Sequence, residues 1–242
     1  MKRIFIVGLA VAIFASQARA IDVGLSQVPI HKDSLATSLI YEHASLHDDF
    51  DTRGRATFKA NVIGARCSYG LSDQLSLAVS GGSIVDPKVE AQGSTFRGGS
   101  GFIYGVDIYN EVFPATAYWP GIQLSLGASG FQTFFDRTVS AGTSATADQR
   151  MSGFDVHGNL LFAEKWGRFS PYLGLRAEAR SIDWTNNELA IESPARIHGT
   201  ARGNVSFIIG LPIQLTKQLR LELESILINQ TALSAGFTWA AF

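Results

Sequence analysis

Two short motifs hold the side chains of this sequence that are best suited to chemistry. Asp49 and Asp51 form a D-x-D motif, and Asp155 and His157 form a D-x-H motif. Alternate residues of a β-strand share a face, so Asp155 could orient the imidazole of His157 to activate a water molecule. These four residues are the candidates for hydrolytic catalysis. The competing interpretation is ordinary polarity of a strand face for the second motif and a solvated loop for the first.

The other reactive side chains give weaker evidence for a functional site. His43 and His47 are four residues apart, a spacing that suits a metal pair on a helix and is too long on a strand without a third ligand. The chain has one cysteine, Cys67, so it cannot form an internal disulfide. We therefore predict no metal site and no cofactor. The net charge of −1 and the absence of a basic run favour no nucleic-acid partner.

The elements that would position these residues have a period of two. The segment 102–111, FIYGVDIYNE, places Phe102, Tyr104, Val106 and Ile108 on one face and Asp107 and Glu111 on the other. Segments 172–180 and 219–224 alternate in the same way, which predicts β-strands with one apolar and one polar face. About ten such segments occur. They lie near residues 36–46, 56–69, 74–84, 100–113, 121–134, 150–163, 169–182, 197–211, 216–228 and 231–242.

These segments are longer than ordinary strands and suit a tilted membrane crossing of about nine to eleven residues. Short turns alternate with long polar stretches at 86–99, 136–149 and 183–196, which we expect to be loops. The pattern predicts an all-β, antiparallel, up-and-down transmembrane β-barrel of about ten strands, with eight or twelve as alternatives. Asp33 and Ser34, just before the first segment, could instead cap a helix through Leu35, Leu39, Glu42 and Leu46.

The N-terminus has the pattern of a secretory signal peptide. Lys2 and Arg3 precede a short apolar stretch, and residues 18–20 form an Ala-x-Ala cleavage site. We expect 1–20 to be a cleaved signal peptide and 21–242 to be a single barrel domain.

Alternation alone leaves the inward face open. A soluble barrel would bury Leu219, Leu221 and Leu223, whereas a membrane barrel would turn Glu222 and its charged neighbours inward. Strand length favours the membrane barrel, as do aromatic residues at strand ends and short turns, where an interfacial girdle belongs. These aromatic residues are Tyr69, Phe113, Tyr118, Trp119, Phe162, Trp166 and Phe169.

The signal peptide, the alternating strands and the terminal Phe242 together resemble the Gram-negative outer-membrane β-barrel family. The resemblance implies an outer-membrane location among lipid and lipopolysaccharide, and recognition of Phe242 by the barrel-assembly machinery. With Phe242 facing lipid, Phe237 and Trp239 fall on the opposite face. We therefore expect either a bulge near residues 240–241 or aromatic side chains that face inward.

On the membrane interpretation, the predicted strands at 169–182, 197–211 and 216–228 carry a ladder of salt bridges inside the barrel. The lumen charge network is predicted to include Asp107, Glu111, Arg176, Glu178, Arg180, Arg202, Arg220, Glu222 and Glu224. The leading functional hypothesis is a monomeric structural or narrow pore-forming (porin-like) protein. One alternative is a surface-interaction or adhesin-type barrel that acts through its long loops. The other is a hydrolase, because the D-x-D and D-x-H pairs resemble the catalytic pattern of the ten-stranded omptin proteases.

Overall fold

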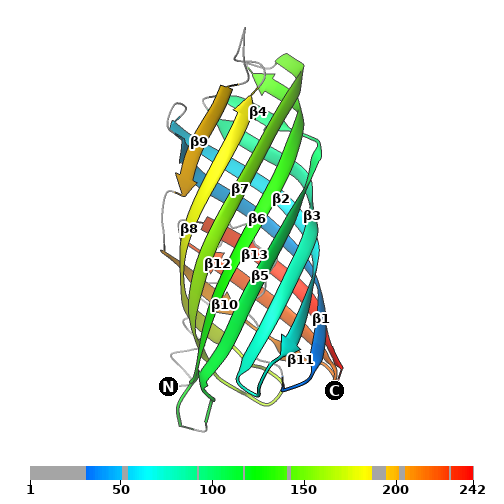
Figure 1. The fold of residues 1–242 in the computed structure, drawn as a ribbon, viewed down its shortest axis with the longest axis vertical. Helices are drawn as coiled ribbons and strands as arrows, with labels where there is room; N and C mark the ends of the chain where they lie inside the picture. The colour runs from blue at the N-terminus through cyan, green and yellow to red at the C-terminus, as the bar shows by residue number, and fades with distance from the viewer. Residues whose placement is uncertain are drawn as a thin grey trace.

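The chain folds as one closed antiparallel β-barrel (Figure 1). The computed structural model describes residues 31–50, 54–91, 93–116, 118–140, 143–186, 195–201, 205–228 and 230–241. Within these ranges the strands are β1 (Leu35–Phe50), β2 (Gly54–Gly70), β3 (Leu75–Ala91), β4 (Ser94–Arg97), β5 (Ser100–Phe113), β6 (Gly121–Ser140), β7 (Thr143–Ala163), β8 (Tyr172–Asn186), β9 (Ala195–Ala201), β10 (Val205–Gly210), β11 (Ile213–Gln214), β12 (Leu219–Leu227) and β13 (Gln230–Ala241). The barrel prediction is confirmed, and the helical alternative for the first segment is wrong.

The number of strands in the wall differs between the two ends of the described barrel. At the end that holds the short turns, a ring of ten closes in the order β1, β2, β3, β5, β6, β7, β8, β10, β12, β13 and back to β1. At the other end, the ring is β1, β2, β3, β4, β6, β7, β8 and β9, which is eight strands. The barrel therefore narrows from ten strands to eight.

The narrowing follows from one short hairpin. The β12–β13 hairpin ends opposite Leu46 of β1, because Leu46 pairs with Gln230, the first residue of β13. β1 continues to Phe50, and its residues 48–50 pair instead with 199–201 of β9. The loss of β12 and β13 from the wall accounts for the two missing strands.

Another strand is interrupted at Gly98 and Gly99, between β4 and β5. Both glycines have positive φ, at 82° and 75°. A Cβ on Gly99 would lie 2.3 Å from the carbonyl oxygen of Phe134. Glycine is therefore required where the strand changes from β4 to β5 against the same two neighbours, β3 and β6.

The polar stretches predicted as long loops are mostly strand in their described residues, whereas residues 92, 141–142 and 187–194 of these stretches lie outside the described ranges. β3 runs to Ala91 and is followed by β4. β6 extends to Ser140, β7 begins at Thr143, and β8 runs to Asn186. The loop prediction failed because these segments keep pairing beyond the membrane, where their outward face meets water and can be polar. Their inward face is apolar, with Val89, Phe96 and Phe135 buried.

The side chains settle which face is inside. Glu222 and Glu224 are each 3% exposed, while Leu223 between them is 39% exposed. The outward face carries an apolar band, represented by Leu39, Ile63, Val79, Val106, Leu126, Val156, Leu175, Phe207 and Leu233. Because such a band on a barrel needs an apolar surrounding, the membrane interpretation holds and the soluble one is wrong.

The last strand corrects a further expectation. β13 keeps a regular register with β1 from Gln230 to Ala241, so no bulge occurs in the described part of the strand. Phe237 and Trp239 are 53% and 51% exposed, and therefore face the lipid side rather than the lumen. Phe242 lies outside the described residues. The expectation failed because it took the facing of the whole strand from that terminal residue.

Candidate functional site

A chain of charged hydrogen bonds crosses the lower half of the barrel interior. Arg66 of β2 donates to Asp107 of β5 over 2.9 Å. The other oxygen of Asp107 lies 3.0 Å from Nε2 of His157, and Nδ1 of His157 lies 2.7 Å from Asp155. All four side chains are at most 7% exposed. Neutral imidazole has one N–H, so His157 can donate to both carboxylates only as imidazolium.

The chain continues around the wall to β1. Arg176 lies 3.3 Å from Asp155 and 3.2 Å from Glu178. Glu178 in turn accepts from Arg180 at 2.5 Å, and Arg180 lies 3.5 Å from Asp48. We call this set the lumen belt: Arg66, Asp107, His157, Asp155, Arg176, Glu178, Arg180 and Asp48. It links strands on different sides of the barrel, which is how buried charges avoid an unpaired state.

One glycine makes room for the belt. Gly127 of β6 lies between β5 and β7, the strands of Asp107 and His157. A Cβ on Gly127 would lie 2.0 Å from Oδ1 of Asp107 and 2.5 Å from Nε2 of His157. The hydrogen bond between the aspartate and the histidine therefore passes directly over this position.

A second set of polar contacts lies beside the belt and joins β8 to β12, β12 to β13, and β13 to β1. Tyr172 donates to Glu224 at 2.5 Å, and Ser234 donates to Glu42 at 2.9 Å. Glu222 accepts from Arg220 and from Thr238, at 2.5 Å and 3.0 Å. The predicted charges on β8 and β12 thus lie inside, and each takes part in a hydrogen bond or ion pair of one of these two sets.

The upper, eight-stranded half is filled by apolar side chains. Its aromatic residues, which we call the aromatic plug, are Phe50, Phe58, Phe96, Phe131, Phe135 and Trp184, each at most 7% exposed. Phe96 and Phe50 meet Trp184 edge-on, with ring centroids 4.9 Å and 5.8 Å apart. Trp184 donates its indole N–H to Gln149 over 2.9 Å, so the plug leaves this polar atom satisfied. Eight strands enclose a space that side chains can fill, and here they do.

The catalytic candidates are not brought together. Asp49 is exposed on the outer face of β1, and Asp51 lies outside the described residues. Asp155 and His157 are buried in the lumen belt and not at a rim, with each ring nitrogen of His157 bonded to a carboxylate. This arrangement leaves no open position beside the imidazole for a substrate or an activated water.

The remaining predicted residues have different locations. Glu111 is half-buried near the short-turn end of β5, and Arg202 lies outside the described residues. Sequence reasoning missed Arg66 and Asp48, which join the belt from β2 and β1. No three potential ligands from His, Cys, Asp and Glu cluster in a way that could hold a metal ion in the described ranges.

Two carboxyl groups beyond the apolar band have shifted pKa values. Asp48 lies between the polar outward residues His47 and Asp49, and burial is the largest cause that raises its pKa from 3.8 to about 6, against the attraction of Arg180. Glu90, on the outer face of β3, lies 2.5 Å from Lys88 and 3.1 Å from Lys59. The hydrogen bond from Lys88 is the main cause that lowers the pKa of Glu90.

Comparison with known proteins gives a fold and not a family. No family model and no curated protein matches the sequence. Among solved structures, the outer membrane protease OmpT from Escherichia coli superposes with a TM-score of 0.52 at 7% identity, over 89% of this chain and 97% of that one. The translocator domain of the autotransporter NalP from Neisseria meningitidis has a TM-score of 0.51 at 8% identity, over 98% of this chain and 97% of that one.

In the described residues no helix is long and apolar enough to cross a membrane. Identities this low carry no activity from one protein to another, because one fold serves many functions. The closed ring, the apolar outer band and both structural likenesses agree on one point: the chain has the fold of the Gram-negative outer-membrane β-barrels.

Proposed function

We propose that this protein is a non-conducting outer-membrane barrel with a structural role, which holds rigid β-hairpins above the membrane. The observation that supports the proposal is the filled interior. The lumen belt and the aromatic plug lie in series along the barrel axis, and their side chains are at most 8% exposed. A continuous solute path would expose these side chains to water.

The experiment is single-channel recording of the refolded protein in planar bilayers. The proposal expects no conductance steps from protein whose heat-modifiable migration on a detergent gel shows a folded barrel. Regular steps of one amplitude from that same folded fraction would instead establish the narrow pore, the other form of the leading hypothesis.

The proposal also includes the route to the membrane. Residues 1–20 have the pattern of a signal peptide cleaved after Ala20, and Phe242 is the residue proposed to guide assembly. N-terminal sequencing of the protein from an outer-membrane fraction tests the first step, since a mature chain that begins at Ile21 is expected. Deletion of Phe242 should lower the amount of folded barrel in that fraction.

A surface-interaction role is the second candidate, because the strands continue beyond the apolar band. The outward residues of β2 and β3 in this region are polar and charged, among them Arg55, Lys59, Lys88 and Glu90. Whole-cell binding to host or abiotic surfaces should fall when the tip of the β6–β7 hairpin is shortened. Unaltered binding by cells that display the same amount of barrel would remove this candidate.

A further inference from the structure

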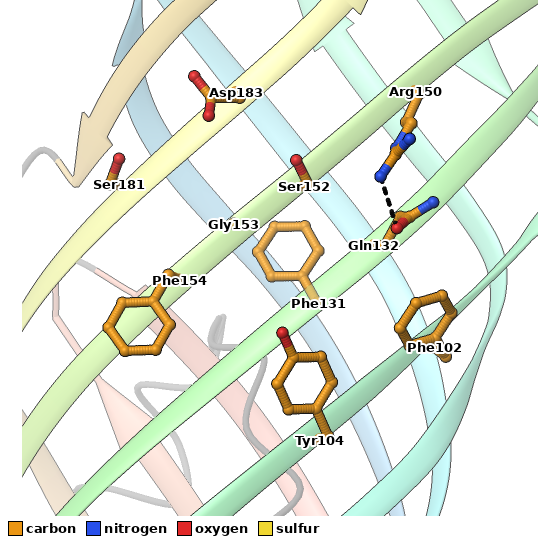
Figure 2. A pocket seen from close by; sticks show the side chains of 10 residues that line it. All are labelled: Phe102, Tyr104, Phe131, Gln132, Arg150, Ser152, Gly153, Phe154, Ser181 and Asp183. Carbon is orange, nitrogen blue, oxygen red and sulfur yellow. Dashed lines mark hydrogen bonds between the residues drawn. The ribbon is translucent and has the colours of Figure 1, made fainter.

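A pocket lies on the outer wall, where the apolar band meets the polar part of β6, β7 and β8 (Figure 2). Its volume is about 310 Å³. Two cross-strand rows build it. The lower row is Tyr104, Gly130, Phe154 and Ser181, and the upper row is Phe102, Gln132, Ser152 and Asp183.

The hollow exists because small residues lie between large ones. Gly130 separates Tyr104 from Phe154 in the lower row, and a Cβ there would come within 2.6 Å of the Tyr104 hydroxyl. Phe102 and Tyr104 stack with ring centroids 6.3 Å apart and are 46% and 56% exposed. One wall of the pocket is therefore an exposed aromatic surface within the apolar band.

The opposite side of the pocket is polar. Arg150 donates to the side-chain oxygen of Gln132 over 2.8 Å, the contact drawn in Figure 2. Arg150 is exposed, its guanidinium carbon lies 6.0 Å from the centroid of the Phe134 ring, and it forms no carboxylate ion pair with any residue the structure describes. A guanidinium has five N–H donors, of which the contact with Gln132 uses one. Asp183 and the hydroxyls of Ser152 and Ser181 complete this side, and Asp183 also lies 3.3 Å from His198.

We infer that this pocket binds a phosphorylated glycolipid of the outer leaflet. Arg150 would pair with the phosphate, because guanidinium matches phosphate geometry. Asp183, Gln132 and the two serines offer acceptors and donors that suit sugar hydroxyls. The exposed rings of Phe102, Tyr104 and Phe154 would contact the acyl chains. The inference rests on the proposed membrane location, because only a lipid at this depth presents both parts of such a molecule to the pocket.

The position along the barrel fixes the leaflet. The short turns and the chain end at Ala241 lie at the opposite end from the pocket, and short turns face the periplasm in barrels of this fold. The pocket residues lie toward the extended hairpins and therefore at the outer leaflet.

Native mass spectrometry of the detergent-solubilised barrel tests the inference. The probes are diphosphorylated lipid A, the same glycolipid without phosphates, and phosphatidylethanolamine. We expect the highest occupancy for the diphosphorylated probe, and a decrease of about tenfold in Arg150→Gln, the scale of one charge-assisted hydrogen bond. Arg55→Gln is the charge-matched control, because Arg55 is exposed elsewhere on the outer wall and should leave occupancy unchanged.

A second pair of variants separates the hollow from the charge. Gly130→Ala should push the Tyr104 ring into the hollow and lower binding of both glycolipids. Gly158→Ala should not, because its Cβ would approach the flexible end of Leu126, at 3.1 Å, and make an ordinary contact with the Ser125 carbonyl oxygen, at 3.6 Å. Equal binding of phosphatidylethanolamine, an equal loss in Arg55→Gln, or full binding by Arg150→Gln would each overturn the inference. Heat-modifiable migration and quenching of Trp239 by lipids measure membrane insertion independently of lipid binding. A failure of the proposed membrane location can therefore be distinguished from a failure of the proposed binding site.

Discussion

His157 is a central residue of the lumen belt, because its two ring nitrogens contact Asp107 and Asp155. Replacement by Leu would leave both carboxylates buried without this partner. Loss of one partner in a buried ion pair costs about 3–5 kcal/mol, so H157L should lower the free energy of unfolding by about that amount. Urea titration of barrels in lipid vesicles, followed by tryptophan fluorescence, measures the change.

His157→Gln serves as the matched control, since its amide can still donate to one aspartate and should recover part of the loss. Equal stability of wild type and H157L would show that the belt contributes little to the fold. This stability prediction does not depend on any catalytic activity. Assays of peptide cleavage with the same variants test the hydrolase hypothesis directly.

Asp48 gives the belt a pH dependence at its outer end. Because its pKa is raised to about 6 in the folded barrel, the folded state holds this proton more tightly than the unfolded state does. The contribution of Asp48 to stability is therefore greatest below about pH 3.8 and declines as the pH rises through about 6. Carbon-13 NMR of the carboxyl groups, assigned with Asp48→Asn, should show a midpoint near pH 6; a midpoint near 4 would contradict the burial argument.

At the scale of elements, each strand has one inward face whose chemistry changes along its length. In β2 the odd residues face outward throughout, yet they change from Arg55, Thr57 and Lys59 to Ile63 and Tyr69. The even residues face inward and change in the opposite sense, from Phe58 to Arg66. The point of inversion marks the outer membrane surface.

This inversion explains what sequence reasoning could and could not provide. Alternation located ten strands and the inward charges of β8 and β12, because Leu219 to Glu224 lie within the band. It did not reveal the aromatic plug, since Phe58 and Phe96 belong to segments where inward means apolar. It also treated the polar outward faces beyond Val85 as loops. Arg66 was missed because it stands alone between the small inward residues Gly64 and Ser68, and Asp48 because it adjoins the D-x-D motif that was interpreted as a solvated loop. Both partners are at least 41 residues away in the sequence, so the pairing depends on closure of the barrel.

The facing of β13 and β8 can be tested through two of the four tryptophans. Trp239 is 51% exposed on the lipid face, whereas Trp184 is fully buried in the plug. In variants that keep one tryptophan and replace the others by Phe, brominated lipids should quench Trp239 strongly and Trp184 little, because quenching requires contact. Similar quenching of the two would contradict the assigned faces. Trp119, which is 73% exposed in the β5–β6 turn, provides a reference near the periplasmic headgroups.

For the whole molecule, the change from ten strands to eight places two different seals in series. The wider half has a polar interior that includes most of the lumen belt. Several of its buried atoms, including Oδ2 of Asp155 and Oδ1 of Asn159, have no hydrogen-bond partner among the described residues. Water can satisfy such atoms, so this half can be hydrated from the periplasm. The narrower half is apolar and close-packed, and we therefore assign the barrier to ions to the aromatic plug.

Removal of the plug should convert the closed barrel into a conducting one. In the triple variant Phe58→Ala, Phe135→Ala and Trp184→Ala, three large buried rings are lost, while the belt below keeps all its contacts. Each substitution should also cost about 3–5 kcal/mol, so folding is checked first by heat-modifiable migration. The folded variant should give conductance steps in planar bilayers where wild type gives none.

The control is a triple variant of the lipid face, with Leu223→Ala, Phe237→Ala and Phe154→Ala. It loses a comparable apolar volume and should give no conductance steps. A silent plug variant that is fully folded would locate the barrier in the lumen belt instead, and steps from the lipid-face control would show that the conductance reflects general loosening of the wall.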